Sequence, residues 1–171
     1  MEKFISIHKM KKAQIWGLDL MVAAMLFLFG IFIFYLYSIN KPTTKEDFEI
    51  LFSEGEIITE DLLSEGYPDN WNSNDAEIIG ITNKKKINET KLENFYNFVK
   101  ADYAKTKSIF NTKYDYYFFL SENMSINGEN IEGIGKPGAT STNINAKNLI
   151  KITRFTIYKE KPITAYLYVW E

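Results

Sequence analysis

The chain has 171 residues and a formal net charge of −2 at neutral pH, with 13 Phe, 11 Tyr and 3 Trp. So many aromatic residues are typical of a packed domain and exclude a disordered chain. Cysteine is absent and the one histidine is His8, which excludes disulfides, and also excludes His/Cys zinc sites and His-based catalytic triads beyond the N-terminus. The part after Asn40 is mildly acidic and has no basic stripe, so no nucleic-acid partner is expected.

A transmembrane helix is predicted over residues 14–40. The stretch from Leu20 to Ile39 is twenty residues without a formal charge, and at about 1.5 Å per residue it is about 30 Å long, the thickness of a bilayer core. Pro42 ends it, because proline cannot continue the helical hydrogen-bond ladder. The run is too long for a cleaved secretory signal and no small-x-small cleavage site follows it, so we predict an anchor that stays on the protein.

The charges around this helix predict its orientation. Residues 1–13 contain four lysines against one glutamate, whereas the flank 41–49 has two lysines against three acids. By the positive-inside rule the N-terminus is cytoplasmic, and residues 41–171 form a single extracytoplasmic domain, the head. Membrane lipid is therefore an expected partner, and the protein is expected to be a single-pass protein of the cell membrane.

Asp19 is a carboxylate at the cytoplasmic edge of the predicted span. A charge at the centre of a bilayer costs roughly 2.5–3.5 kcal/mol, and less near the edge. Two interpretations remain open. Asp19 is either an interfacial charge that reaches headgroup water, or a carboxylate kept to pair with a cation on a neighbouring subunit.

The residues before the span carry a family resemblance. Lys11-Lys12-Ala13-Gln14-Ile15-Trp16-Gly17-Leu18-Asp19, followed at once by the apolar helix, resembles the class III signal peptide of archaeal type IV pilin-like proteins. More weakly, the segment 63–71 and the ending 154–170 resemble recurrent segments of uncharacterised archaeal proteins with such leaders.

The resemblance implies that residues 1–13 are a basic leader removed by a membrane leader peptidase, with Lys12 and Ala13 at its end and Gln14 as the first mature residue. In this family an acidic residue near the fifth mature position neutralises the new N-terminal amine of a subunit in the assembled filament. Asp19 would be sixth if cleavage precedes Gln14 and fifth if it follows, and it is Asp where Glu is commoner. Other pilin-like subunits are the implied partners, and the resemblance implies neither enzymatic activity nor a cofactor.

The predicted fold class of the head is α+β, with helices packed on a small antiparallel sheet. Residues 43–65 read as a helix in two pieces, because Thr43-x-x-Glu46 and Thr59-Glu-Asp are typical helix starts and Gly55 lies between them. Gly66 suits the C-cap of that helix, and Trp71 is expected to fill the core beneath the turn that follows.

A second helix is predicted from the capping box Thr90-x-x-Glu93 to about Phe110. Strands are predicted over 77–82, 113–120, 149–158 and 163–170, the last two as an antiparallel hairpin joined by residues 159–162. In 113–120 the side chains that share one apolar face are Tyr114, Tyr116, Phe118 and Leu120. Both faces of the hairpin carry apolar residues, as expected if a helix packs on one face and another subunit or element contacts the other.

Residues 121–147 are predicted to be a long, exposed and flexible loop, rich in Gly, Asn, Ser and Thr. They contain Gly133-Ile-Gly135-Lys-Pro-Gly138, formally GxGxxG. We reject a dinucleotide site, because the motif opens no predicted helix, Pro137 interrupts it and no parallel βαβ unit surrounds it. No acidic cluster has the spacing of an EF-hand, so no metal site is predicted.

Asn88 and Asn123 begin glycosylation sequons, which would face outward in the predicted topology. Two sequons are what chance gives in a chain this rich in Asn, and Asn88 can equally serve as a helix cap. The function expected from these features is that of a pilin-like or minor-pilin structural subunit of a surface filament or its assembly machinery. The alternative is a membrane-anchored binding or adhesion domain that does not assemble. An extracytoplasmic enzyme is the least favoured class, because the head has neither His nor Cys.

Overall fold

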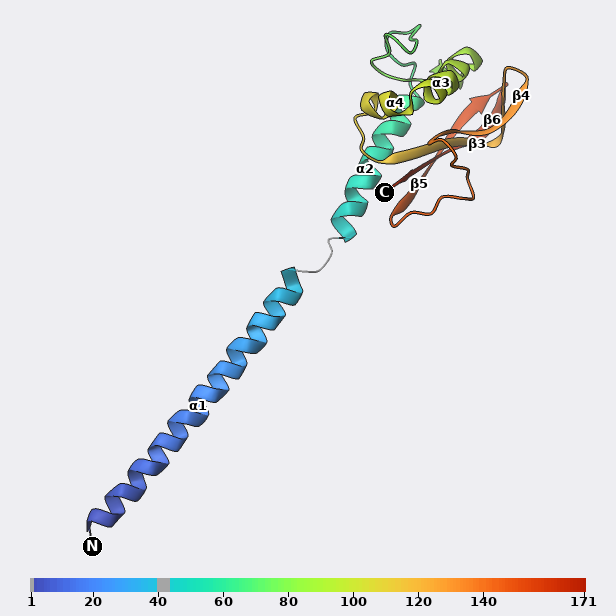
Figure 1. The fold of residues 1–171 in the computed structure, drawn as a ribbon. Coiled ribbons are helices and arrows are strands. Elements are labelled where there is room, and N and C mark those ends of the chain that lie inside the picture. Colours follow the sequence, from blue (N-terminus) through green and yellow to red (C-terminus); the bar gives the residue numbers. More distant parts are fainter. Residues whose placement is uncertain (1, 40–43) are drawn as a thin grey trace. The chain divides into compact units, whose positions relative to one another are not determined.

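A computed structural model describes the backbone of residues 2–39 and 44–171, and the side chains of residues 17–39 and 47–171. The chain divides into two compact units, Met1–Thr43 and Thr44–Glu171. The first contains helix α1 (Glu2–Ile39), and the second is an α+β head of helices and one sheet (Figure 1). The α+β class is therefore confirmed. The predicted helix stop at Pro42 and the cap at Thr43 lie outside the described residues.

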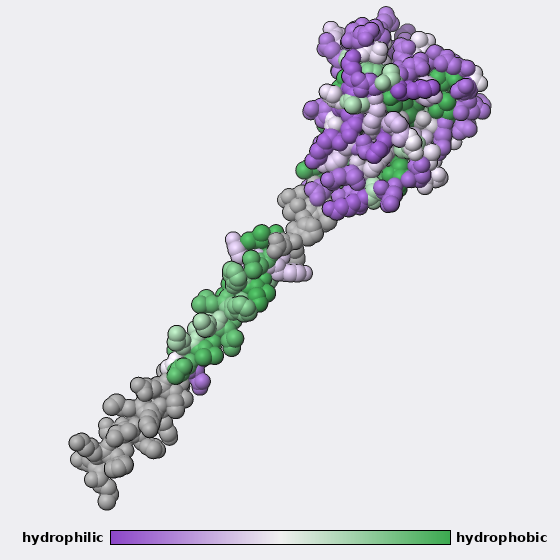
Figure 2. Space-filling model, viewed as in Figure 1, coloured by the Kyte–Doolittle hydropathy of each residue, from purple (hydrophilic) through white to green (hydrophobic). Residues whose placement is uncertain are grey.

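Helix α1 contains one segment, Gly17–Ile39, that is long and apolar enough to cross a membrane. It has 23 residues, a mean hydropathy of 2.4 and no buried residue. Figure 2 shows hydrophobic side chains along this part of α1, while the visible surface of the head is mostly hydrophilic. The predicted apolar helix is confirmed, and its length and composition suit a membrane anchor or a signal sequence.

Helix α2 (Thr44–Leu62) is continuous, so the predicted break at Gly55 is wrong. A β-carbon at Gly55 would lie 2.7 Å and 2.9 Å from the end methyl groups of Ile152 and Ile150. Gly55 is therefore where the helix axis comes close to the sheet. Leu51, Ile58 and Leu62 share this buried face at helical spacing.

The chain from Leu63 to Ile81 packs against itself around Trp71. This side chain is 1% exposed and donates from its indole Nε1 to the carbonyl of Gly80 at 2.8 Å, which confirms it as a core residue. Gly66 has φ +74°, but it lies four residues after the last residue of α2 and so is not its immediate cap. The predicted strand 77–82 is wrong for residues 77–81, where Ile78 makes only an isolated bridge with Tyr67, and only Thr82 lies in a strand, β1 (Thr82–Asn83).

The predicted helix from Thr90 to Phe110 is two helices, α3 (Glu89–Ala101) and α4 (Tyr103–Ile109), separated at Asp102. Asp102 has φ −152°, and its side chain accepts from the N–H of Lys105, so it caps α4. The N-cap of α3 is Asn88 and not the predicted capping box at Thr90. The two helices together bury one apolar face, which contains Leu92, Phe95, Phe98, Val99 and, just after α4, Phe110.

The head contains one six-stranded sheet with the order β1-β2-β5-β6-β3-β4. Its neighbouring strands are antiparallel, except that β2 runs parallel to β5 through the single pair Lys86–Ile157. The sheet is thus mixed, whereas an antiparallel one was predicted. The strand bounds are Thr82–Asn83 (β1), Lys86–Ile87 (β2), Asp115–Ile126 (β3), Glu129–Gly135 (β4), Leu149–Tyr158 (β5) and Lys161–Trp170 (β6).

Strands β3 and β4 form a hairpin where a long loop was predicted, so the loop prediction is wrong for residues 121–135. The turn is Asn127-Gly128, with φ values of 53° and 81°, as a two-residue turn of type I′ requires. The register shifts between Phe119 and Met124, which marks a bulge on β3. The hairpin of β5 and β6 is confirmed, but Lys159-Glu160 alone forms its turn and β6 already begins at Lys161.

Helices α2, α3 and α4 pack on one face of the sheet. Helix α2 meets β5 and β6 through Gly55, while Phe95 of α3 and Tyr103 of α4 lie against Tyr116 of β3. The apolar face predicted for 113–120 is confirmed, because its side chains, which are Tyr114, Tyr116, Phe118 and Leu120, are 0–5% exposed. The opposite face carries the other aromatic side chains of β3, β5 and β6, which are Tyr117, Phe119, Phe155, Tyr166, Tyr168 and Trp170.

Candidate functional site

The residues predicted to act in processing and assembly all lie on α1. Lys12, Ala13 and Gln14 belong to the same continuous helix as Asp19, and the Asp19 side chain is exposed. Asp19 is the only charged residue between Gly17 and Ile39. Five residues of helix correspond to about 7.5 Å along the axis, so a carboxylate at 19 lies more than one turn away from an amine at residue 14 of the same helix. With Gln14 as the first residue the predicted charge pairing therefore requires two chains, whereas an amine at Ile15 would lie about one turn from Asp19.

The two sequon asparagines have different surroundings. Asn88 is half-buried, and its Oδ1 accepts from the N–H of Lys91 at 3.0 Å, so the capping role considered for it is confirmed. Asn123 is exposed in the bulge of β3. Modification of either residue stays a prediction.

The glycines of the formal GxGxxG motif lie mostly in a strand. Gly133 and Gly135 belong to β4, and the chain after them makes a turn in which Ala139 donates to the carbonyl of Lys136 at 3.0 Å. The ring of Tyr117 lies over Gly133, because a β-carbon there would be 2.4 Å from it. An aromatic side chain that covers a glycine across an antiparallel pair stabilises a strand that is otherwise poor in side chains.

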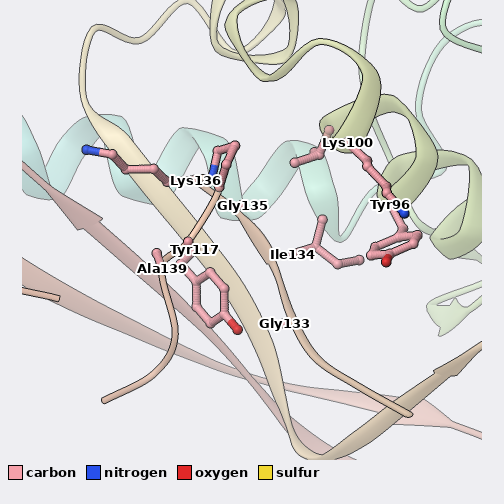
Figure 3. A pocket seen from close by; sticks show the side chains of 11 residues that line it. Tyr96, Lys100, Tyr117, Gly133, Ile134, Gly135, Lys136 and Ala139 are labelled. Atoms are coloured by element: carbon pink, nitrogen blue, oxygen red, sulfur yellow. The ribbon is translucent and has the colours of Figure 1, made fainter. Parts of the chain in front are cut away.

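A pocket of about 310 Å³ lies between α3 and the end of β4. In Figure 3 the ring of Tyr96 and the side chain of Lys100 reach toward Ile134 from α3, and Tyr117 lies on the other side of the strand. Lys100 holds its ammonium 5.7 Å from the centre of the Tyr96 ring. Burial and the nearby charge of Glu132 raise the pKa of Tyr117 to about 12, so its hydroxyl is protonated at neutral pH. The lining of this pocket is thus aromatic and glycine-rich, with a cation at one rim.

Asp115 holds Lys136, which is the second lysine that lines the pocket. Its carboxylate accepts from Lys136 at 2.6 Å and from Lys107 at 3.2 Å. Burial acts to raise the pKa of Asp115, but the hydrogen bonds and charges of the two lysines outweigh it and lower the pKa. The hydroxyl of Tyr103 also donates to Asp115, at 3.2 Å. Lys136 is therefore ion-paired within the head, and its ammonium points away from the pocket (Figure 3).

The face of the sheet opposite the helices carries a line of aromatic rings. The ring of Phe119 lies 5.0 Å from both Tyr166 and Tyr168, measured between centres. Lys151 holds its ammonium 4.0 Å from the centre of the Tyr166 ring. Next to them, Phe155 is 86% exposed, which is the highest exposure among the large apolar side chains that the structure describes. Within the described part of the chain, no three His, Cys, Asp or Glu side chains gather as a metal site would require.

The sequence did not lead us to predict strand β4 or the pocket beside it. Asn127-Gly128 between two alternating stretches is a strong hairpin signal, and it would have placed Gly133 and Gly135 in a strand. The pocket itself had no such signal, because Tyr96 and Tyr117 come together only through the packing of α3 beside β4.

No protein-family description, curated protein or solved structure matches this chain.

Proposed function

We propose that this protein is a pilin-like subunit, with α1 held in the membrane and the head outside the cytoplasm. The observation that carries the proposal is Asp19, the only charge in the apolar segment Gly17–Ile39, which lies just after a basic leader. Because the side chains of this segment are exposed all round the helix, they need an apolar surrounding, which lipid or other subunits supply.

The charge pairing follows from the chemistry of processing. Cleavage next to Gln14 frees an ammonium group on the helix, and on assembly this amine leaves water together with the apolar segment. An unpaired buried ammonium is very unfavourable, so a carboxylate from a neighbouring subunit stabilises the assembled state. Asp19 is the only acid between Lys12 and Glu46, and thus the only candidate on the helix.

The deciding experiment compares wild type with Asp19→Asn and Asp19→Glu at matched expression, measuring filament yield or crosslinked subunits. Asp19→Asn should insert and fold normally but assemble poorly, whereas Asp19→Glu, which keeps the charge, should assemble as wild type does. Equal assembly by Asp19→Asn would remove the charge-pairing mechanism, because the neutral amide of asparagine cannot compensate a buried ammonium group.

Processing and topology are tested separately. Mass spectrometry of the mature protein should find Gln14 at the N-terminus, with Ile15 as the second choice. Protease added to intact cells should degrade the head and leave the first 40 residues protected. Finding Met1 or Glu2 as the only N-terminus in cells with an active leader peptidase would favour a simple tether, and a protected head would reverse the orientation.

The alternative function is an anchored binding or adhesion domain that does not assemble. The observation in its favour is that Gly17 and Gly30 are the only glycines in the apolar segment and have no GxxxG spacing, so α1 lacks that standard helix-pairing motif. For such a tether, Asp19→Asn should be neutral or slightly favourable to insertion. The same comparison of variants therefore separates the two functions.

A further inference from the structure

The sheet of the head has two open edges. Strand β4 is the last strand on one side. On the other side, β2 pairs with β5 only at Ile157, so the stretch from Leu149 to Thr156 has no neighbour there among the described strands. Open strands present unpaired N–H and C=O groups, which another chain can pair with.

The hydrogen bonds of β4 show which of its main-chain groups face outward. The N–H of Lys136 donates to the carbonyl of Tyr116 on β3 at 2.9 Å. Because bonding residues alternate along an antiparallel strand, Ile134 also faces β3. Gly133 and Gly135 therefore direct their main-chain groups toward the open side, next to the pocket that they line.

Strand β5 also has alternate main-chain groups that face its open side. The N–H of Glu171 donates to the carbonyl of Asn148 at 3.1 Å, in register with the pairing of β5 and β6. Even-numbered residues of β5 thus bond to β6, and Lys151, Thr153 and Phe155 direct their main-chain groups outward.

The two edges also match in direction. Along β5, β6, β3 and β4 each strand is antiparallel to its neighbour, so β4 runs opposite to β5. A second head displaced sideways, in the same orientation, would thus bring its β5 against β4 of the first as another antiparallel pair. The alternation would continue from one head to the next, as an added strand continues a sheet.

The side chains of the two edges are complementary. Phe155 points to the face opposite the helices, and on this same face the glycines of β4 have no side chains of their own. An exposed aromatic anchor that packs on an aromatic ring of its partner, as Phe155 would on Tyr117, is the usual centre of an energetically important contact. The two strands also differ in charge, since β4 carries Glu129 and Glu132 and no base, while β5 carries Lys151 and Arg154 and no acid.

The helix beside the β5 edge adds apolar surface to it. Arg154 pairs with Glu56 of α2. Phe52 lies one helical turn before Glu56 and therefore on the same side of α2, and it is 51% exposed. Phe52 and Phe155 thus flank the open edge from the two faces of the sheet.

We propose that heads associate edge to edge, with β5 of one copy adding to β4 of the next and Phe155 packing against Tyr117 and Gly133 at the rim of the pocket. This inference rests on the proposed function and adds a contact between heads to the contact between helices. The two surfaces are different, so the contact is heterologous and extends into an open row of subunits instead of closing as a two-fold dimer.

The test uses the absence of native cysteine. Two differently tagged full-length chains, one with Thr153→Cys and one with Ala139→Cys, are co-expressed in membranes and treated with a short bismaleimide. Thr153 is on the outer face of β5 beside Phe155, and Ala139 lines the pocket. A mixed 153–139 product is expected. Absence of that product would overturn the proposal, because it would show that the two edges do not pair. A product only between two chains that both carry Thr153→Cys would also overturn it, because it would indicate a two-fold contact.

The role of the anchor is tested in the same cysteine pair. Phe155→Ala should lower the mixed product about tenfold or more. Ile57→Ala removes an exposed apolar side chain from α2 and should leave the amount of mixed product unchanged. Equal product with Phe155→Ala would overturn the assignment of Phe155, and circular dichroism of each purified variant confirms that the head is folded.

A third crosslink separates this inference from the function on which it rests. Ala24→Cys in α1 reports contact between anchors. Crosslinks at 24 without a 153–139 product would leave the pilin-like assembly standing and refute the edge contact between heads. A lack of both would refute the two together.

Discussion

A β-carbon at Gly55 of α2 would lie 2.7 Å from the Cδ1 atom of Ile152 on β5. Glycine lowers helix stability by about 1 kcal/mol relative to alanine. Glycine nevertheless suits this position, because a side chain there would enter the contact between α2 and the sheet.

Gly55→Leu should destabilise the head by about 1–3 kcal/mol, because the new side chain overpacks the contact with Ile150 and Ile152. Gly55→Ala should cost less, because the end methyl groups of the isoleucines can shift and the helix gains propensity. Denaturant unfolding of the full chain in detergent measures both. Ser53→Ala, at an exposed site of α2, is the control and should change stability by less than about 0.5 kcal/mol.

Lys91 is a buried cation whose loss should destabilise the head. Its Nζ donates to the carbonyl of Glu65 at 2.7 Å, to Asp69 at 3.0 Å and to the carbonyl of Thr82 at 3.3 Å. Lys91→Met leaves the two carbonyls without this donor, so we expect a loss of about 1–3 kcal/mol in the free energy of unfolding.

The matched control for Lys91 is Lys86→Met. Lys86 pairs with Glu160 at 2.7 Å, but both side chains are largely exposed, and such pairs contribute about 0–1 kcal/mol. If both variants lost the same stability, the buried cation would have no special role in holding the segment from Leu63 to Thr82.

Asp115 should make the head sensitive to acid. Its pKa is lowered in the folded state, so it stabilises the fold above its unfolded pKa of about 3.9 and this contribution is lost as the pH falls through the folded pKa. Asp115→Asn should therefore lower the melting temperature at pH 7, and the difference from wild type should narrow below about pH 4. Thermal melts from pH 7 to pH 3 measure this, with the exposed Glu122→Gln as the control. A constant difference across this range would contradict the assignment.

The two-residue turns give a pair of opposite predictions. Gly128 has φ +81°, so Gly128→Ala should destabilise by about 1 kcal/mol. Lys85, in the turn between β1 and β2, has φ +64° without being glycine, so Lys85→Gly should stabilise by a similar amount. Unfolding curves of the two variants should shift in opposite directions. A shift in the same direction would show that backbone strain does not dominate at these turns.

Local patterns predicted much of the fold. Alternation correctly placed Tyr116 and Phe118 in the core, and the pattern around Trp71 correctly predicted a buried side chain, because burial requires apolar residues at a spacing that each element fixes by itself. The apolar segment of α1 was also predicted correctly, because a run of twenty residues without a charge is visible in the sequence and does not depend on contacts with other segments. Asp19 was found in the same way, as the exception within that segment.

The tertiary structure decided what depends on contacts between distant residues. From the sequence alone, Gly55 indicates a break in a helix and Gly133 indicates a loop. The contact of Gly55 with β5 and the pairing of Gly133 with β3 show that both glycines lie inside regular elements. The matching edges of β4 and β5 are no property of either strand alone, because they depend on strand order and on which main-chain groups the neighbours already use. A sequence specifies local periodicity at every residue, but the close approach of two segments is a property of the packed chain, and the pocket beside Gly133 exists only there.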